Sequence, residues 1–475
     1  MAIYLNKSAW LFVFLSIIPF IGYSQSFSRA IAPKFSWHSE HHANLPFHPF
    51  DTLLTTKFNR KNHWAMGMPW QKPFAQFQSK NFYIEPIVQN THFNTVQGWE
   101  SSLIAYKNFP GNLVLKASIN YGFTDQVLRP TIGIWKTLSK QSSLFASIGN
   151  KINQFNNSPA IVPRANSIGS LFFEDNFAKL YESKFFYFDY LFLKNIKKTT
   201  LTIKNTLLLA RNNALKNKSS QYFFNDQEDS YFSNNPIFPR DYTQKAFNNF
   251  NQISHEINIQ FSSISGTNNA HKQTALLGLR TALPFNISSP LAPVELLGAN
   301  KFGAANSLAY ENLLKPYAPY IMIVLQHKQL IEFHKIGHLS SFIQFGSFIK
   351  EKDIPFTDFK HFNGNQTKVV RGEYTEVFNL LPYYEMSTDN SFSQWHIEHN
   401  FKGFLLDKIP LIKKLDWESI ISLKRLIRSG EISYTELAFG IGNIGFTNNR
   451  ILRLEYVQSY FGSQYSKGFT VGLIF

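Results

Sequence analysis

The sequence predicts an all-β protein, specifically a transmembrane antiparallel β-barrel of about sixteen strands, with fourteen as the alternative count. Three observations predict this class: an export signal at the N-terminus, alternation of apolar and polar residues along many short segments, and a final segment that ends on an aromatic residue. The chain has 475 residues, a formal charge of +16 and no cysteine, and 16% of its residues are charged. The lack of cysteine excludes a disulfide framework and a thiol nucleophile.

Residues 1–24 have the layout of a cleavable secretory signal peptide. Lys7 precedes an apolar run at 9–21, and Gly22 and Ser24 put small residues before a cut at Gln25. The run is shorter than the roughly 20 residues that span a bilayer as a helix. An uncleaved anchor is the alternative. Because no later apolar stretch reaches 18 residues, we expect no helical membrane span.

Alternation with a period of two residues recurs from about residue 94 to the C-terminus. A strand with one apolar face should alternate in this way, as Trp395 and Ile397 do with their polar neighbours. Similar segments lie at 113–121, 201–209, 256–262, 433–442 and 450–460. A soluble β-sandwich also alternates. The number of segments, each near ten residues, favours the barrel, and roughly 24 residues per strand and connection give about sixteen strands.

The last segment is typical of a transmembrane strand that carries an insertion signal. Phe469, Val471, Leu473 and the terminal Phe475 share one face. This pattern is similar to the C-terminal insertion signal of outer-membrane barrels. It therefore predicts the cell outer membrane as the location and the outer-membrane assembly machinery as a partner.

Six segments resemble one family of Bacteroidota outer-membrane proteins, whose barrel domain is of unknown function and often follows a carboxypeptidase-regulatory-like domain. They are FNTVQGW (93–99), AKLYE (178–182), NGNQT (363–367), FNLLPYYEMSTD (378–389), HIEHNFKGFLLDKIPLIKKL (396–415) and YTELAFGIGNI (434–444). The stretch 378–415 is the most specific. The resemblance implies an outer-membrane barrel that is distantly similar to assembly-factor barrels. We see neither the regulatory-like domain before residue 93 nor room for periplasmic repeat domains.

The predicted organisation is a signal peptide at 1–24, an N-terminal extension at 25–92 and the barrel at 93–475. The extension is expected to be periplasmic or to occupy the lumen. The long polar connections at 212–250, 283–316 and 352–390 suit extracellular loops or lumen plugs. Counting back from a periplasmic C-terminus places 428–432 and 461–465 outside, and 405–414 and 444–449 in the periplasm.

Polar residues on the lumen side of the C-terminal strands are expected to form a network across the barrel wall. Its predicted members are His396, Glu398, Asn400, Lys402, Glu436, Arg453 and Glu455, with Glu418 and Lys424 on neighbouring strands. The mixed signs favour structural pairing over an ion-selective ring.

No metal site or cofactor is predicted. His396 and His399 would face opposite sides of a strand, whereas a metalloprotease motif needs both on one helical face. His38, His41, His42 and His48 cluster in the extension, and we interpret them as an exposed loop without metal.

The charge of +16 is compatible with nucleic-acid binding, but export and dispersed basic residues argue against it. The basic residues at predicted strand ends are expected to meet lipopolysaccharide phosphates; they are Arg211, Lys350, Arg425, Arg450 and Lys467.

The predicted function is non-enzymatic, in transport, export or envelope assembly. The alternative is a structural or surface-interaction barrel with a plugged lumen and partner-binding loops. An outer-membrane barrel hydrolase is the least favoured function, because no local motif joins Ser, His and a carboxylate.

Overall fold

The computed structural model describes residues 77–78, 81–156, 161–223, 231–265, 271–285, 317–366, 369–371, 374–430, 433–446 and 449–473. All of them belong to one compact unit, residues 74–474. The predicted signal peptide at 1–24, the histidine cluster at 38–48 and Phe475 lie outside the described residues.

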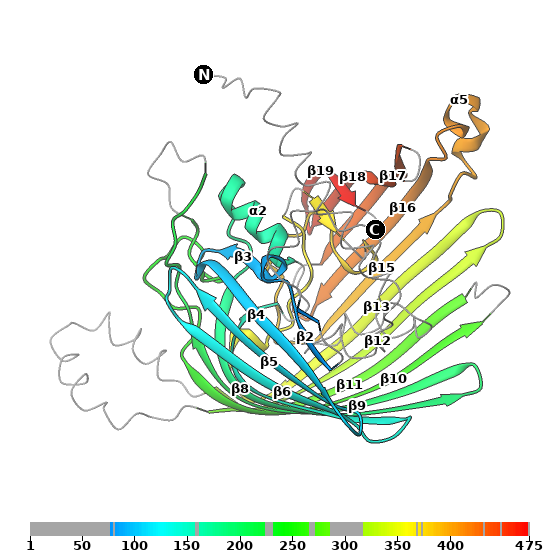
Figure 1. Cartoon of the computed structure of the whole chain (residues 1–475). Helices are drawn as coiled ribbons and strands as arrows, with labels where there is room; N and C mark the ends of the chain where they lie inside the picture. The colour runs from blue at the N-terminus through cyan, green and yellow to red at the C-terminus, as the bar shows by residue number, and fades with distance from the viewer. Residues whose placement is uncertain are drawn as a thin grey trace, which may run out of the picture. The chain divides into compact units, whose positions relative to one another are not determined.

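A single sheet contains all nineteen described strands (Figure 1). The fifteen long strands are β4 (Gly98–Phe109), β5 (Leu113–Gly122), β6 (Leu128–Thr137), β7 (Ser142–Gln154), β8 (Leu180–Ile196), β9 (Thr199–Ala214), β10 (Phe250–Ser265), β11 (His271–Phe285), β12 (Tyr320–Phe333), β13 (Gly337–Lys350), β15 (Phe392–Asn400), β16 (Glu418–Arg428), β17 (Tyr434–Phe446), β18 (Asn449–Phe461) and β19 (Gln464–Leu473). The short strands are β1 (Phe77–Gln78), β2 (Phe82–Ile84), β3 (Thr91–Asn94) and β14 (Val369–Arg371). Each long strand pairs antiparallel with its neighbours along the chain.

Few described residues are helical. The helices are η2 (Ile87–Asn90), α2 (Pro163–Phe173), η4 (Phe356–Asp358), η5 (Tyr374–Glu376), η6 (Leu406–Lys408) and α5 (Pro410–Lys413). None of these described helices combines the length and the apolar character needed to cross a bilayer. The predicted all-β, antiparallel barrel class is therefore confirmed.

The predicted strand count agrees with the sheet. β2 and β3 pair side by side with the same edge of β4, so together they take one position beside the fifteen long strands. This gives sixteen positions, and the short strands β1 and β14 pair in addition with β2 and β19. Because β2 and β3 begin at Phe82 and Thr91, the sheet includes residues that precede the expected barrel start at 93.

The long connections all lie at the same end of the strands. The turns 110–112, 138–141, 197–198 and 334–336 lie at one end, according to the strand registers. The connection 401–417, with η6 and α5, lies at that end too. The opposite end carries all the connections of 25 residues or more, together with several short ones. These long connections are 155–179, 215–249, 286–319 and 351–391.

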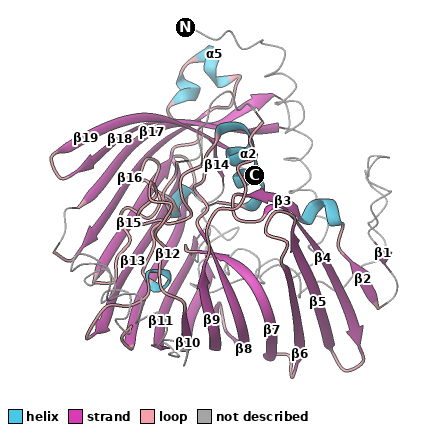
Figure 2. Cartoon of the chain, turned by 90° about the vertical axis from the view of Figure 1, so that its left-hand side faces the viewer, coloured by secondary structure: helices cyan, strands magenta, loops and turns pink. Residues whose placement is uncertain are grey.

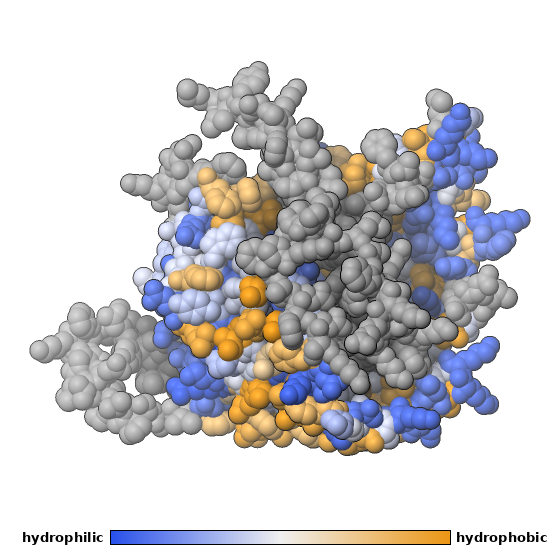
Figure 3. Space-filling model, viewed as in Figure 1, coloured by the Kyte–Doolittle hydropathy of each residue, from blue (hydrophilic) through white to orange (hydrophobic). Residues whose placement is uncertain are grey.

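One side of the sheet, which we call the outer face, exposes large apolar side chains. In β16, Ile421 and Leu423 are 40% and 42% exposed, and Leu325 in β12 is 52% exposed. Their neighbours one residue along the strand, such as Ser422 and Lys424, are buried. Figure 3 shows apolar side chains gathered along the lower part of one view. The alternation read from the sequence therefore corresponds to an apolar outer face and a polar inner face.

The first and last strands do not pair with each other among the described residues. β19 pairs with β18 and, in parallel, with β14, whereas the edge of β4 that faces away from β5 pairs with β2 and β3. Figure 2 draws β19 and β2 at opposite margins of the sheet.

Candidate functional site

The candidate site is the inner face together with residues 351–391, which we call the inner segment. This segment connects β13 to β15, and it packs across the inner face rather than away from it. The sequence left open whether this connection is a loop or a plug, and the contacts below identify it as a plug-like cover.

A buried ionic group joins the inner faces of β15 and β18. Arg453 donates two hydrogen bonds to the carboxylate of Glu398, at 3.0 and 2.7 Å, and a third to Glu455 at 2.6 Å. Arg453 and Glu455 are 3% and 2% exposed. Strand alternation places all three side chains on the same face. The planar guanidinium has several N–H donors, so it can bind one carboxylate in bidentate fashion and still donate to a second.

Glu436 and Lys424 attach the inner segment to the strands. Glu436 of β17 accepts hydrogen bonds from the backbone N–H groups of Asn379 and Leu380, both at 2.7 Å. Lys424 of β16 donates to the carbonyl of Val377 at 2.7 Å and to Oδ1 of Asn379 at 2.5 Å. Two charged strand side chains thus satisfy backbone groups of the cover, as buried polar groups require.

Further ion pairs attach the inner segment elsewhere on the inner face. Asp358 lies 3.2 Å from the guanidinium of Arg280 in β11. Glu376 contacts Lys328 of β12, and Asp389 contacts Lys350 of β13. The inner segment is therefore held along its length, by strands from β11 to β17.

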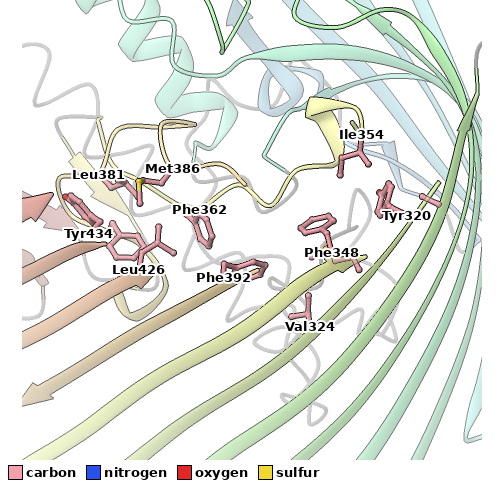
Figure 4. Close-up of a cluster of buried hydrophobic side chains, with 13 residues drawn as sticks. Tyr320, Val324, Phe348, Ile354, Phe362, Leu381, Met386, Phe392, Leu426 and Tyr434 are labelled. Carbon is pink, nitrogen blue, oxygen red and sulfur yellow. The ribbon is translucent and has the colours of Figure 1, made fainter. Parts of the chain in front are cut away.

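Apolar packing adds to these polar contacts (Figure 4). The inner segment contributes Ile354, Phe362, Leu381 and Met386, and the strands contribute Tyr320, Phe348, Phe392, Leu426 and Tyr434. Phe378, fully buried, lies over His396 with ring centroids 4.4 Å apart. These side chains form a core between the sheet and its cover.

His361 of the inner segment is buried in surroundings that disfavour its protonated, charged form. Its Nδ1 lies 2.7 Å from the hydroxyl of Ser387 and its Nε2 lies 3.0 Å from the carbonyl of Phe356. Burial lowers the pKa of His361 to about 3, although the hydrogen bond to Phe356 acts in the opposite direction. The adjacent Lys360 is also buried, which lowers its pKa to about 8.

The predicted network residues have different surroundings. Glu398, Arg453 and Glu455 meet directly, and Glu436 joins them through Asn379, whose amide lies 3.3 Å from Glu455. His396 is hydrogen-bonded to Gln394 at 2.7 Å.

Two predicted members lie away from this group. Asn400 donates to Glu418 at 2.7 Å instead. Lys402 is exposed in the turn after β15. It is outside the network because the strand ends at Asn400, so alternation no longer applies.

Several residues of the site were not predicted. Arg280 lies on the inner face of β11, and the alternation in 274–283 could have located it. Asp358, Glu376 and Asn379 come from an irregular connection without periodicity, so no sequence pattern indicates their contacts. Among the described residues no group of three or more His, Cys, Asp or Glu side chains could hold a metal ion.

The N-terminal half of the inner face is also paired. Lys204 of β9 lies 3.1 Å from Asp189 of β8. Arg129 of β6 lies 2.6 Å from Asp125 and 2.9 Å from Glu182. Opposite charges thus pair with one another at several places on the described part of the inner face, and both signs are present there.

A curved antiparallel sheet with a charged, covered inner face and an apolar outer face defines a β-barrel protein. The model of a family of unknown function, the DUF5686 C-terminal domain, matches residues 70–273 and 302–441. The chain belongs to this family. The predicted membership of a barrel family of unknown function is thereby confirmed, while the Bacteroidota source and the carboxypeptidase-regulatory-like domain stay predictions.

Comparison with solved structures gives similarities at low identity and with low TM-scores. CdiB from Acinetobacter baumannii is 11% identical with a TM-score of 0.35, and 80% of this chain matches 58% of that one. BamA from Haemophilus ducreyi, lacking POTRA domains 1–3, is 8% identical with a TM-score of 0.39 and coverages of 80% and 69%. OccK1 (OpdK) from Pseudomonas aeruginosa is 10% identical, with a TM-score of 0.29 and coverages of 82% and 94%. No curated protein matches the sequence.

Proposed function

We propose that the protein is a non-enzymatic β-barrel of the cell outer membrane that acts in transport, export or envelope assembly. In this proposal residues 1–24 are a signal peptide removed on export, residues 25–92 are an N-terminal extension and residues 93–475 are the barrel. The family itself has no assigned function, so the proposal rests on the polarity of the two faces.

The observation that carries this proposal is that the sheet exposes apolar side chains and buries charged ones, the opposite of a water-soluble protein. The described inner face buries charged residues such as Lys424 and Arg453, whereas the outer face exposes Leu325, Leu423 and Phe469. Water-soluble proteins rarely expose large contiguous apolar surfaces. Transmembrane barrels present such a surface to lipid and keep their polar side chains inside.

The position of the long connections at one end of the strands supports an orientation of the barrel in the membrane. Transmembrane barrels of the outer membrane have short periplasmic turns and longer extracellular loops. The turn at 334–336 and the end of β19 would therefore be periplasmic, and the connections at 155–179 and 215–249 would be on the outer side. In this orientation the predicted insertion signal would be available to the assembly machinery. The signal comprises Phe469, Val471, Leu473 and Phe475.

Lipopolysaccharide is proposed as a partner of the extracellular rim. Arg211, Arg425 and Lys467 are exposed on the outer face near the long-connection end, where lipid phosphates would lie. Lys350 instead contacts Asp389 of the inner segment, and the side chain of Arg450 is outside the described set.

A second candidate is a structural or surface-interaction barrel with a plugged lumen. The inner segment favours it, because its ion pairs and apolar core cover the strands from β11 to β17. Single-channel recording in planar bilayers separates the two candidates. Stepwise current supports a pore for transport, and a folded but silent barrel supports the plugged alternative.

Membrane insertion is the first test of the proposal. The mature chain should enter the outer-membrane fraction and show a folded form that migrates faster than the heated form on gels. A monomer that stays dissolved without detergent would overturn the proposal. Loss of other barrels from the envelope of a deletion strain would support an assembly role.

A further inference from the structure

The outer edge of β19 is the part of the sheet that the proposed function leaves unexplained. One side of β19 pairs fully with β18, from Gln464 to Leu473. On the other side, among the described residues, only Val471–Leu473 have a strand partner. The backbone groups of residues 464–470 on that side would face hydrocarbon, where each unpaired N–H or C=O costs several kcal/mol.

The chain places one of its own strands at the end of this edge. β14 pairs in parallel with β19, with Val370 opposite Gly472. β14 belongs to the inner segment, and Leu380 from the same segment lies against β19, because a Cβ on Gly468 would be 3.0 Å from its Cδ2. The last strand therefore already accepts an additional strand over three of its ten residues.

We propose that the edge of β19 is an acceptor site for an extended β-strand of another polypeptide, which continues or replaces the pairing made by β14. Backbone hydrogen bonds to a sheet edge are a general means of binding extended segments. This inference rests on the proposed function, since it assumes that the edge lies in the bilayer.

The chemistry of the occupant follows from the two faces of β19. Phe469 is 81% exposed and Val471 is 38% exposed on the outer face, while Thr470 is buried on the inner face. A strand that extends this sheet must place apolar side chains outward and small or polar ones inward. β19 has ten residues, and transmembrane strands need about 9–11. The fitting partner is thus an alternating segment of a membrane β-strand protein, about ten residues long.

Disulfide capture tests the acceptor site, because the natural chain has no cysteine. The probe is the peptide QYSKGFTVGLIF, which copies residues 464–475 and alternates as required, with cysteine placed in turn at each inward position. The full chain, folded in lipid vesicles, carries Ser466→Cys at the edge. The matched control is Ser459→Cys in β18, which lies opposite Ser466 but has strand neighbours on both sides.

We expect at least tenfold more peptide adduct with Ser466→Cys than with Ser459→Cys, and no such difference with a scrambled peptide. Equal or absent adducts in a chain that has inserted and folded would overturn the acceptor site alone. A chain that does not insert would overturn the proposed function instead.

The role of β14 is tested by weakening it. Replacing Val369, Val370 and Arg371 together with glycine should raise the yield of the Ser466→Cys adduct several-fold, because glycine is a poor strand former and the resident strand would leave more readily. An unchanged yield, with the edge adduct still present, would contradict displacement of β14 by the incoming strand.

Discussion

At the scale of single residues, the inner face depends on charges that cannot be removed one at a time. Arg453 serves two buried carboxylates, Glu398 and Glu455, and these acids would remain buried without a counter-charge if it were lost. Breaking a buried ion pair from one side typically costs about 3–5 kcal/mol. The pairing of opposite signs therefore matters more here than the number of charges.

Arg453→Ala should lower the free energy of unfolding by about 3–5 kcal/mol, because it leaves two buried carboxylates unpaired. Urea titration of the protein folded in vesicles would measure this loss. Arg425→Ala is the control, since Arg425 is an exposed outer-face residue, and we expect a change within about 0.5 kcal/mol. A similar loss in both variants would contradict a special role for the ionic group.

A second residue-scale prediction concerns His361, whose burial lowers its pKa to about 3 from the ordinary 6.5. Between pH 6.5 and 3 the unfolded chain binds a proton at this histidine that the folded chain does not bind. The free energy of unfolding therefore falls as the pH falls from 6.5 towards 3. Above pH 6.5 His361 is neutral in both the folded and the unfolded chain, so it no longer makes stability depend on pH. His361→Phe should flatten the pH dependence of the urea midpoint between pH 6.5 and 4. The exposed His334→Gln serves as the control, and an equal effect of both substitutions would reject this explanation.

At the scale of elements, the inner segment decides whether the barrel has an open path. Its ion pairs to Arg280 and Lys328, its backbone contacts with Glu436 and its apolar core lie across strands β11 to β17. The segment thus behaves as a cover attached at many points, rather than as a loop that leaves the lumen clear.

Replacing residues 355–386 with a short Gly-Ser linker should open a conducting path and lower stability, because the segment supplies both the plug and part of the core. Planar bilayer recordings should then show larger unitary currents than those of the unmodified protein. Shortening the connection at 401–417, at the other end of the strands, should leave the current unchanged. No gain in current after the replacement would contradict a plugging role.

At the scale of the whole molecule, the distribution of polarity distinguishes a membrane barrel from a soluble sheet. The outer face of each long strand contributes apolar residues to one surface, and the inner face collects the charges. Such a surface is stable against lipid but favours aggregation in water. The cost of placing a charge on this surface should therefore depend on how deep in the bilayer the position lies along the strand.

Leu423→Arg, in the middle of β16 on the outer face, should destabilise the barrel by about 2–4 kcal/mol in vesicles. Tyr465→Arg, at the end of β19 next to the turn 462–463, should cost about 0–1 kcal/mol because the charge reaches the interface. Urea unfolding from vesicles gives both values. Equal costs would argue against a membrane-spanning orientation of the strands.

Alternation along the chain determined much of the fold. It predicted the all-β class, about sixteen strands and the inward direction of Glu398, Glu436, Arg453 and Glu455, because side chains on a strand point alternately to opposite faces. Lys402 follows the end of β15 at Asn400 by two residues and is exposed, so alternation gives no direction for its side chain. The same local rule could have located Arg280 on β11.

The contacts of the inner segment and the short pairing of β14 with the edge of β19 were decided only by the tertiary structure. Asp358 and Asn379 reach Arg280 and Glu436 over sequence separations of 78 and 57 residues, and no periodicity in an irregular connection encodes such contacts. Which strand lies beside β19 depends on how far the whole sheet curves. Side-chain alternation is a local property of the backbone, whereas plugging and edge pairing arise from the summed geometry of all the strands.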